Sequence, residues 1–240
     1  MTQFIPRIDQ ALYAGQDKNW DNALFRLHVL AATRAEHQIL DLGAGAGIVP
    51  QLNFLGAAAW VCGVDPDPRV GTNPYLDDGR MGRGEHIPYP DNTFDVVFSA
   101  NVLEHLSNPL EVFREVNRVL KPGGAFLFKT PNRWHYMPVI AQLTPTRFHK
   151  FFNRLRGRAA VDTFPTLYRA NSARAIHRLA AGSGFTVKSL RFVEGRPEYL
   201  RFSTLTYLVG ATYERLMNRF DVLARFRIVM IGALVKSPGL

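Results

Sequence analysis

Three glycines at alternating positions form the stretch of this sequence that is best suited to hold a ligand. The segment "ILDLGAGAGIV" runs from Ile39 to Val49 and places these glycines at positions 43, 45 and 47. Glycine allows the backbone angles of a sharp turn and lets ligand atoms approach the main chain closely. A helix that begins after the turn would offer free N–H groups, so the pattern predicts a polar or anionic ligand.

An acidic residue, Asp65, stands where it could bind part of the same ligand. It ends the apolar run "AWVCGVD", 18 residues after Gly47. Because an acid at this point of dinucleotide folds accepts hydrogen bonds from ribose, we expect a ligand that contains ribose. The dinucleotide fingerprint G-x-G-x-x-G would need its third glycine where this chain has Ile48. That large side chain disfavours a pyrophosphate cradle and hence a NAD-dependent dehydrogenase.

The elements that must position these residues alternate between strands and helices. Apolar runs predict strands at 38–44, 59–65, 94–100, 125–132, 185–193 and 226–236. Helical spacing predicts helices at 20–30, 48–56, 109–120 and 171–185, the last with Asn171 or Ser172 as its cap. Residues 66–84, which are rich in proline and glycine, are expected to be mostly loop. This alternation predicts an α/β domain with a mostly parallel sheet.

Four successive motifs resemble those of the class I S-adenosylmethionine-dependent methyltransferases. They are "ILDLGAGAG", "VCGVDP", "GRGEHIPYPDNTFDVVFSANVLEHL" and "REVNRVLKPGG", which together span roughly 39–132. The most similar subgroup carries "PFPDNSFD" and "LEH" signatures. The resemblance implies a Rossmann-like, seven-stranded, mostly parallel sheet with helices on both faces and a last antiparallel strand. It also implies S-adenosyl-L-methionine as cofactor and one methyltransferase domain over 1–240.

The resemblance assigns cofactor-binding roles to residues at the ends of the predicted strands. The residues that would line the methionine part of the cofactor are Asp41, Gly43, Ala44, Gly45 and Gly47. Asp65 would hold the ribose, and the adenine would be bordered by Pro66, Gly84 and Glu85. Asn101 would face both the cofactor and the substrate. Many relatives have an aspartate where this chain has Arg83, and arginine cannot accept a hydrogen bond. This departure leaves open a cofactor-binding regulatory protein without catalysis. A structural role for Asp41 or Asp65 also remains an alternative.

Methyl transfer to an oxygen atom would benefit from a general base, and histidine is the side chain best suited to that role at neutral pH. The candidates are His105 and His135, which follow predicted strands, and His149, which lies in a long insertion. The sequence does not rank them. Glu104 fits equally well as a helix cap or as the partner of a basic neighbour. Some quinone methyltransferases bind a cation through an "EVLEH" signature, and "ANVLEH" in this chain lacks the first acid of that signature. The chain also has only one cysteine, so no metal is expected.

The two halves of the chain differ in charge. Residues 1–120 have a balance of −6, whereas residues 121–240 have a balance of +15, which suggests an anionic partner for the second half. The insertion at 133–171 is long enough for a substrate lid. Within it, "TRFHKFFNRLRGR" places phenylalanines at helical spacing among basic residues, which fits either a lid packed on the core or contact with an anionic membrane. The amphipathic helix expected at 198–220 fits a dimer interface, a membrane contact or a roof over the pocket.

The insertion, with its segments "TPN", "LTP", "GR" and "YRAN", also resembles methyltransferases of bacterial polysaccharide and glycolipid pathways. That resemblance implies O-methylation of a sugar hydroxyl on an anionic or lipid-linked saccharide, with methylation of a quinone or another small molecule as the alternative. Nucleic acid is not expected, since no separate RNA-binding module is visible. The N-terminal residues lack the apolar core of a signal peptide, which predicts a cytoplasmic location. A lipid-linked acceptor would place the protein at the inner face of the membrane.

Overall fold

The computed structural model describes residues 4–15, 19–143 and 165–237. It divides into two compact units. Unit 1 contains Met1–Trp20, Pro131–Thr166 and Phe192–Val229, and unit 2 contains Asp21–Thr130, Leu167–Arg191 and Met230–Leu240. His149 and the basic segment at 146–158 lie outside the described residues, so the roles predicted for them stay predictions.

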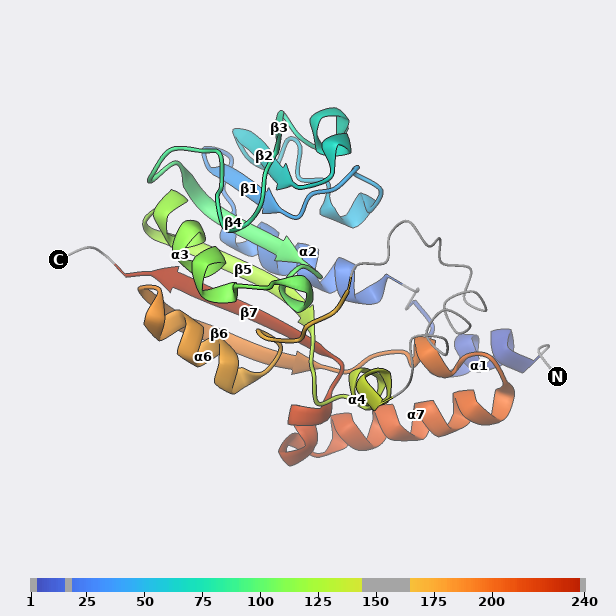
Figure 1. Ribbon diagram of the computed structural model, residues 1–240. Coiled ribbons are helices and arrows are strands. Elements are labelled where there is room, and N and C mark those ends of the chain that lie inside the picture. The colour runs from blue at the N-terminus through green and yellow to red at the C-terminus, as the bar shows by residue number, and fades with distance from the viewer. Residues whose placement is uncertain (1–3, 16–18, 144–164, 238–240) are drawn as a thin grey trace. The chain divides into compact units, whose positions relative to one another are not determined.

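Unit 2 is built on a seven-stranded sheet in the order β3-β2-β1-β4-β5-β7-β6 (Figure 1). Its strands are β1 (Gln38–Leu42), β2 (Trp60–Asp65), β3 (Asp78–Met81), β4 (Phe94–Ala100), β5 (Leu120–Pro131), β6 (Phe185–Val193) and β7 (Val229–Lys236). The first five strands pair in parallel, whereas β7 runs in the opposite direction between β5 and β6 (Figure 1). This topology confirms the predicted Rossmann-like fold class.

The centre of the sheet is buried on both faces, as its continuous apolar runs predict. Ile39 and Leu40 of β1 pair with Val96 and Val97 of β4, and all four side chains are inaccessible to solvent. Helix α2 (Trp20–Ala32) lies on one face, while α3 (Pro109–Val119) and α6 (Ala173–Gly182) lie on the other (Figure 1). Burial at the centre leaves the strand ends as the part of the sheet that can present polar groups.

Two parts of the predicted secondary structure around the glycine loop are wrong. The helix expected at 48–56 is only a 3-10 turn, η2 (Pro50–Leu52). Pro50 holds Val49 in an extended conformation, since the residue before a proline is disfavoured in a helix. No α-helix therefore begins directly after the glycines to supply N–H donors. Residues 66–84, expected to be mostly loop, contain η3 (Pro68–Thr72) and the short strand β3, whose "DGRM" sequence has no apolar run.

Unit 1 consists mainly of helical elements. These are α1 (Ile5–Leu12), α4 (Tyr136–Leu143), η6 (Glu198–Leu200), α7 (Thr204–Arg219) and η7 (Asp221–Phe226). The helix expected at 198–220 is thus split, because the Ser203 side chain accepts a hydrogen bond from the Thr206 N–H and starts α7 there. Tyr13 at the end of α1 and Tyr207 of α7 stack with their ring centroids 5.9 Å apart, which joins the two helices. Among the described residues, no helix is long and apolar enough to cross a bilayer.

Candidate functional site

The three glycines of the loop after β1 are required by both backbone angle and packing. Gly43, Gly45 and Gly47 have φ values of +89°, +52° and +69°, in the left-handed region that other residues adopt at a cost. A Cβ atom on Gly43 would lie 2.2 Å from Cγ2 of Val102, and one on Gly47 would lie 2.2 Å from Oδ1 of Asn73. The loop is therefore a turn of half-buried backbone at which other residues would be strained.

Asp65 holds this loop from the end of β2. Its Oδ2 accepts a hydrogen bond from the Gly45 N–H at 2.9 Å, and its Oδ1 accepts one from the Asp67 N–H at 2.8 Å. An ionised carboxylate has about four acceptor positions, so each oxygen can accept a further hydrogen bond from a ligand. The structure thus brings together the acid and the glycine loop, with Pro66 exposed beside them.

Asp41 lies at the base of the same loop and is almost completely buried. Burial, with the nearby charge of Asp65 as the smaller cause, raises the pKa of the Asp41 carboxyl well above its usual value. Burying a charge without a partner is costly, so ionisation of Asp41 would be favoured by a positive charge placed beside it. A cationic part of a ligand at the loop would have this effect.

Asn73 is a residue of this site that the sequence analysis missed. Its Nδ2 donates hydrogen bonds to the carbonyl oxygens of Ala44 and Gly45, at 3.0 and 3.2 Å, and its Oδ1 accepts from the Tyr75 N–H at 2.9 Å. The side chain is buried. Its only sequence signal is the "NP" turn dipeptide, which says nothing about the distant loop it supports.

The other predicted cofactor-binding residues lie around the carboxyl ends of β3 and β4. Asn101 directly follows β4 with a φ of +59°, and its N–H donates to the carbonyl oxygen of Lys129. Gly84 packs closely against Val112, while Glu85 accepts a hydrogen bond from the Ser107 hydroxyl at 3.4 Å. Ligands of open α/β sheets bind at the carboxyl edge, which is where these residues are found.

Glu104 is buried in the 3-10 turn η4 (Leu103–His105), and it is not a helix cap. Its Oε2 accepts a hydrogen bond from the Thr130 hydroxyl at 2.9 Å, and Thr130 in turn accepts one from Nδ2 of Asn171 at 2.6 Å. The main-chain oxygen of Glu104 accepts the N–H groups of Leu167 and Tyr168. Burial raises the pKa of the Glu104 carboxyl. This network holds η4, the end of β5 and the chain that returns from the insertion.

The two histidines that the structure describes at candidate base positions have different environments. His105 is partly exposed at the end of η4, with its Nε2 4.0 Å from Oε1 of Glu104. His135 belongs to unit 1 and is almost inaccessible, and its Nδ1 accepts the Met137 N–H. Its Nε2 lies 3.6 Å from Oε2 of Glu194. Burial lowers the pKa of His135 to about 3, so its ring is neutral at pH 7.

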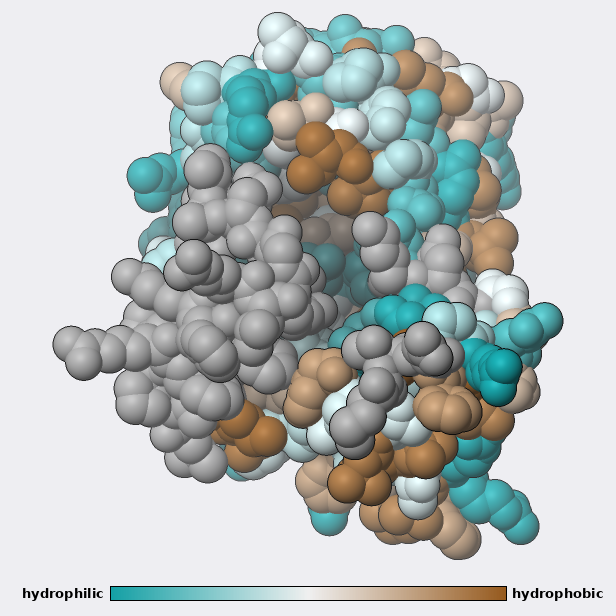
Figure 2. Space-filling model, turned by 90° about the vertical axis from the view of Figure 1, so that its right-hand side faces the viewer, coloured by the Kyte–Doolittle hydropathy of each residue, from teal (hydrophilic) through white to brown (hydrophobic). Residues whose placement is uncertain are grey.

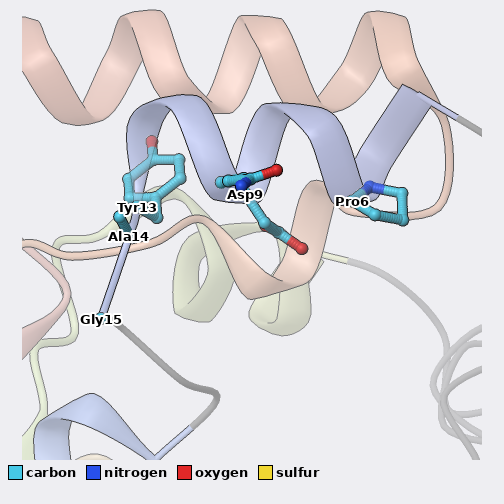
Figure 3. Close-up of a pocket in the computed structure, with 6 residues that line it drawn as sticks. Pro6, Asp9, Tyr13, Ala14 and Gly15 are labelled. Atoms are coloured by element: carbon cyan, nitrogen blue, oxygen red, sulfur yellow. The ribbon is translucent and has the colours of Figure 1, made fainter.

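Two further observations concern other kinds of site. The described residues contain no group of three or more His, Cys, Asp and Glu side chains that could hold a metal ion. A shallow hollow of about 470 Å³ lies along α1 in unit 1, and Asp9 and Tyr13 are among its lining residues (Figure 3). None of its lining residues belongs to the glycine loop, so we place the candidate site at the loop on chemical grounds.

Comparison with known proteins identified related methyltransferases. Residues 40–128 match the family described as "Methyltransferase domain". A "probable S-adenosylmethionine-dependent methyltransferase" of Mycolicibacterium smegmatis is 34% identical over 128 residues, which are 49% of each chain. The "uncharacterized methyltransferase YcgJ" of Bacillus subtilis is 35% identical over 135 residues, 52% of this chain and 51% of that protein. This chain thus spans about half the length of the curated relatives it matches.

Solved structures show the same fold at low identity. The "[4+2]-cyclase SpnF" has a TM-score of 0.59 at 17% identity, and the match covers 94% of this chain and 86% of the cyclase chain. YcgJ has a TM-score of 0.54 at 20% identity, and the match covers 90% of this chain and 98% of YcgJ. A cyclase among these structures illustrates that the fold alone does not define a reaction. The match at residues 40–128 includes the glycine loop and Asp65, and a related sequence is described as S-adenosylmethionine-dependent.

Proposed function

We propose that this protein is an S-adenosylmethionine-dependent methyltransferase whose acceptor is a sugar hydroxyl on a saccharide or glycolipid. The hydrogen bond between Asp65 Oδ2 and the Gly45 N–H carries the first part of this proposal. It joins the two features that would bind the two ends of the cofactor, namely the glycine loop and a carboxylate that can accept further hydrogen bonds. A dinucleotide is disfavoured, since Ile48 stands where its fingerprint needs glycine.

The bound cofactor supplies a methyl group already activated on a sulfonium centre, so the protein has mainly to bind and align. Asp65 would accept hydrogen bonds from the ribose hydroxyls. The glycine loop would pack against the methionine part, where Asp41 offers a buried carboxyl. Because a neighbouring positive charge favours the ionised form of a carboxyl, the cationic cofactor would lower the raised pKa of Asp41 and gain an ion pair.

Among the described residues, His105 is the base candidate best placed to contact an acceptor. It is partly exposed in unit 2, the unit that contains the glycine loop and Asp65. The nearby Glu104 is held by Thr130 and could orient the ring. A histidine here would hold the acceptor hydroxyl through a hydrogen bond and would take up its proton. His135 is enclosed, and both it and His149 remain candidates to be tested beside His105.

The charge of the second half of the chain supports an anionic acceptor. Its balance of +15 fits a saccharide bearing phosphate or carboxylate groups, or one linked to an anionic lipid at the inner face of the membrane. The same charge fits RNA, and a "tRNA U34 carboxymethyltransferase" of Saccharophagus degradans is 31% identical over 124 residues, 48% of this chain and 37% of that protein. Quinones and other small molecules are the remaining acceptor class.

An acceptor screen tests this proposal. The purified protein is incubated with S-adenosylmethionine carrying an isotope-labelled methyl group and with four fractions of a native extract: free saccharides, lipid-linked saccharides, quinones and RNA. Label in a saccharide fraction, released as an O-methyl sugar on hydrolysis, is expected. Label confined to quinones or RNA would reject the sugar acceptor but retain the methyltransferase. Tight cofactor binding without transfer to any fraction would favour a non-catalytic regulatory protein.

A further inference from the structure

Exposed apolar side chains are concentrated in unit 1. Among the described residues, 16 large hydrophobic side chains are exposed, and 11 of them belong to unit 1, which is the smaller unit. Figure 2 shows apolar side chains gathered at the lower right of that view, over α7. Single exposed apolar residues are ordinary, whereas a contiguous group marks an interaction surface.

The inner face of α7 is already covered within unit 1. Tyr207, Gly210, Ala211 and Met217 are buried, and the hydroxyl of Tyr207 donates a hydrogen bond to Asp9 of α1. A Cβ atom on Gly210 would lie 2.7 Å from Cβ of Pro197, so the helix packs closely on the chain that precedes it. This packing fixes which side of α7 faces outward.

The outer face of α7 is apolar over three turns. Leu205, Leu208, Val209 and Leu216 are 73%, 45%, 58% and 46% exposed, and their spacing of i, i+3, i+4 and i+11 places them in one stripe. Thr212 completes the stripe, and its hydroxyl donates to the Leu208 carbonyl oxygen at 2.9 Å. Since this polar group is satisfied within the helix, the whole stripe can leave water at little cost.

The charged side chains on the outer half of α7 are all positive. At 100° per residue, Arg215 and Arg219 fall on the same half of the helix as the stripe, and both are exposed. The one acidic residue of α7, Glu214, faces α1, where it accepts hydrogen bonds from the Tyr13 hydroxyl and from Asn218. Asp221, just beyond the helix, is paired with Arg227. The outer face therefore presents apolar side chains and cations together.

We propose that the outer face of α7 binds an anionic membrane surface, with its leucine stripe among the acyl chains and Arg215 and Arg219 at the lipid headgroups. An amphipathic helix with this combination lies in the plane of the interface. A second copy of the chain fits less well, because this face of α7 carries no carboxylate that could pair with Arg215 and Arg219 of the other copy. The inference does not depend on which acceptor is methylated.

Vesicle sedimentation of the full chain tests this proposal. We expect binding to vesicles of phosphatidylcholine mixed with phosphatidylglycerol, weaker binding as salt is added, and little binding to phosphatidylcholine alone. The double variant Leu205→Asn/Val209→Asn should lower the partition coefficient about tenfold or more, since it removes two inserted apolar side chains. Arg215→Gln and Arg219→Gln should each lower it about fivefold on the anionic vesicles only.

The matched control is Leu27→Asn, because Leu27 is 64% exposed on a helix of unit 2. It should bind vesicles like the parent protein, and thermal melting of every variant checks that the fold is retained. Absence of binding at low salt overturns the proposal, as does binding that the α7 variants leave unchanged. A concentration-dependent dimer that the double variant abolishes, without vesicle binding, would instead assign this face to a second copy.

Discussion

Replacing Asp65 by alanine is the most direct test of the cofactor site. The carboxylate already accepts hydrogen bonds from the N–H groups of Gly45 and Asp67 and is proposed to accept two more from the ribose. A hydrogen bond to a charged group contributes about 1.5–3 kcal/mol, so loss of the ribose contact should weaken binding of S-adenosylmethionine and S-adenosylhomocysteine about tenfold to 150-fold. Calorimetric titration measures both dissociation constants.

The variant also removes a support of the glycine loop, and a second ligand separates the two effects. An S-adenosylhomocysteine analogue without the ribose hydroxyls should bind the parent protein weakly and should lose little further affinity in Asp65→Ala. Equal weakening of both ligands would mean that Asp65 acts only through the loop. Asp67→Ala is the matched control. It removes a neighbouring carboxylate that is paired with Arg69, but it keeps the main-chain N–H group that donates a hydrogen bond to Asp65. Unchanged affinity in Asp65→Ala would refute the assignment.

Three further predictions concern the loop support, the base and a buried pair. Asn73→Ala should lower stability by about 1–3 kcal/mol in denaturant titration and weaken cofactor binding, because it leaves the carbonyl oxygens of Ala44 and Gly45 without their donor; unchanged binding would contradict this role. His105→Ala should lower turnover about 10²–10⁴-fold with little effect on S-adenosylhomocysteine binding, and near-normal turnover would exclude it as the base. Burial raises the pKa of Glu194 from about 4.5 to about 8, so the stability it contributes is complete below pH 4.5 and is lost as the pH rises towards 8. Glu194→Gln should therefore flatten the decline of melting temperature across this range, and an unaltered decline would contradict the shift.

Local patterns in the sequence were sufficient for the central sheet and the cofactor loop. The glycines at 43, 45 and 47 follow an apolar run and predict a turn, and all three adopt left-handed backbone angles. The apolar runs at β1 and β4 predict buried strands and the amphipathic stripe at 109–120 predicts a helix, and the structure has all three. Each of these inferences depends on neighbours in sequence, which is why it succeeded.

Interactions between distant segments decided the rest. Asn73 supports a loop almost thirty residues away, and Glu104 contacts Thr130, so neither role has a signature in the surrounding residues. His135 and His105 both follow strands, yet only the tertiary structure encloses one and leaves the other partly exposed. The same holds for α7, whose amphipathic pattern does not say which face is covered. Its inner face packs within unit 1 and leaves the leucine stripe outside, because packing depends on which surfaces meet rather than on periodicity alone.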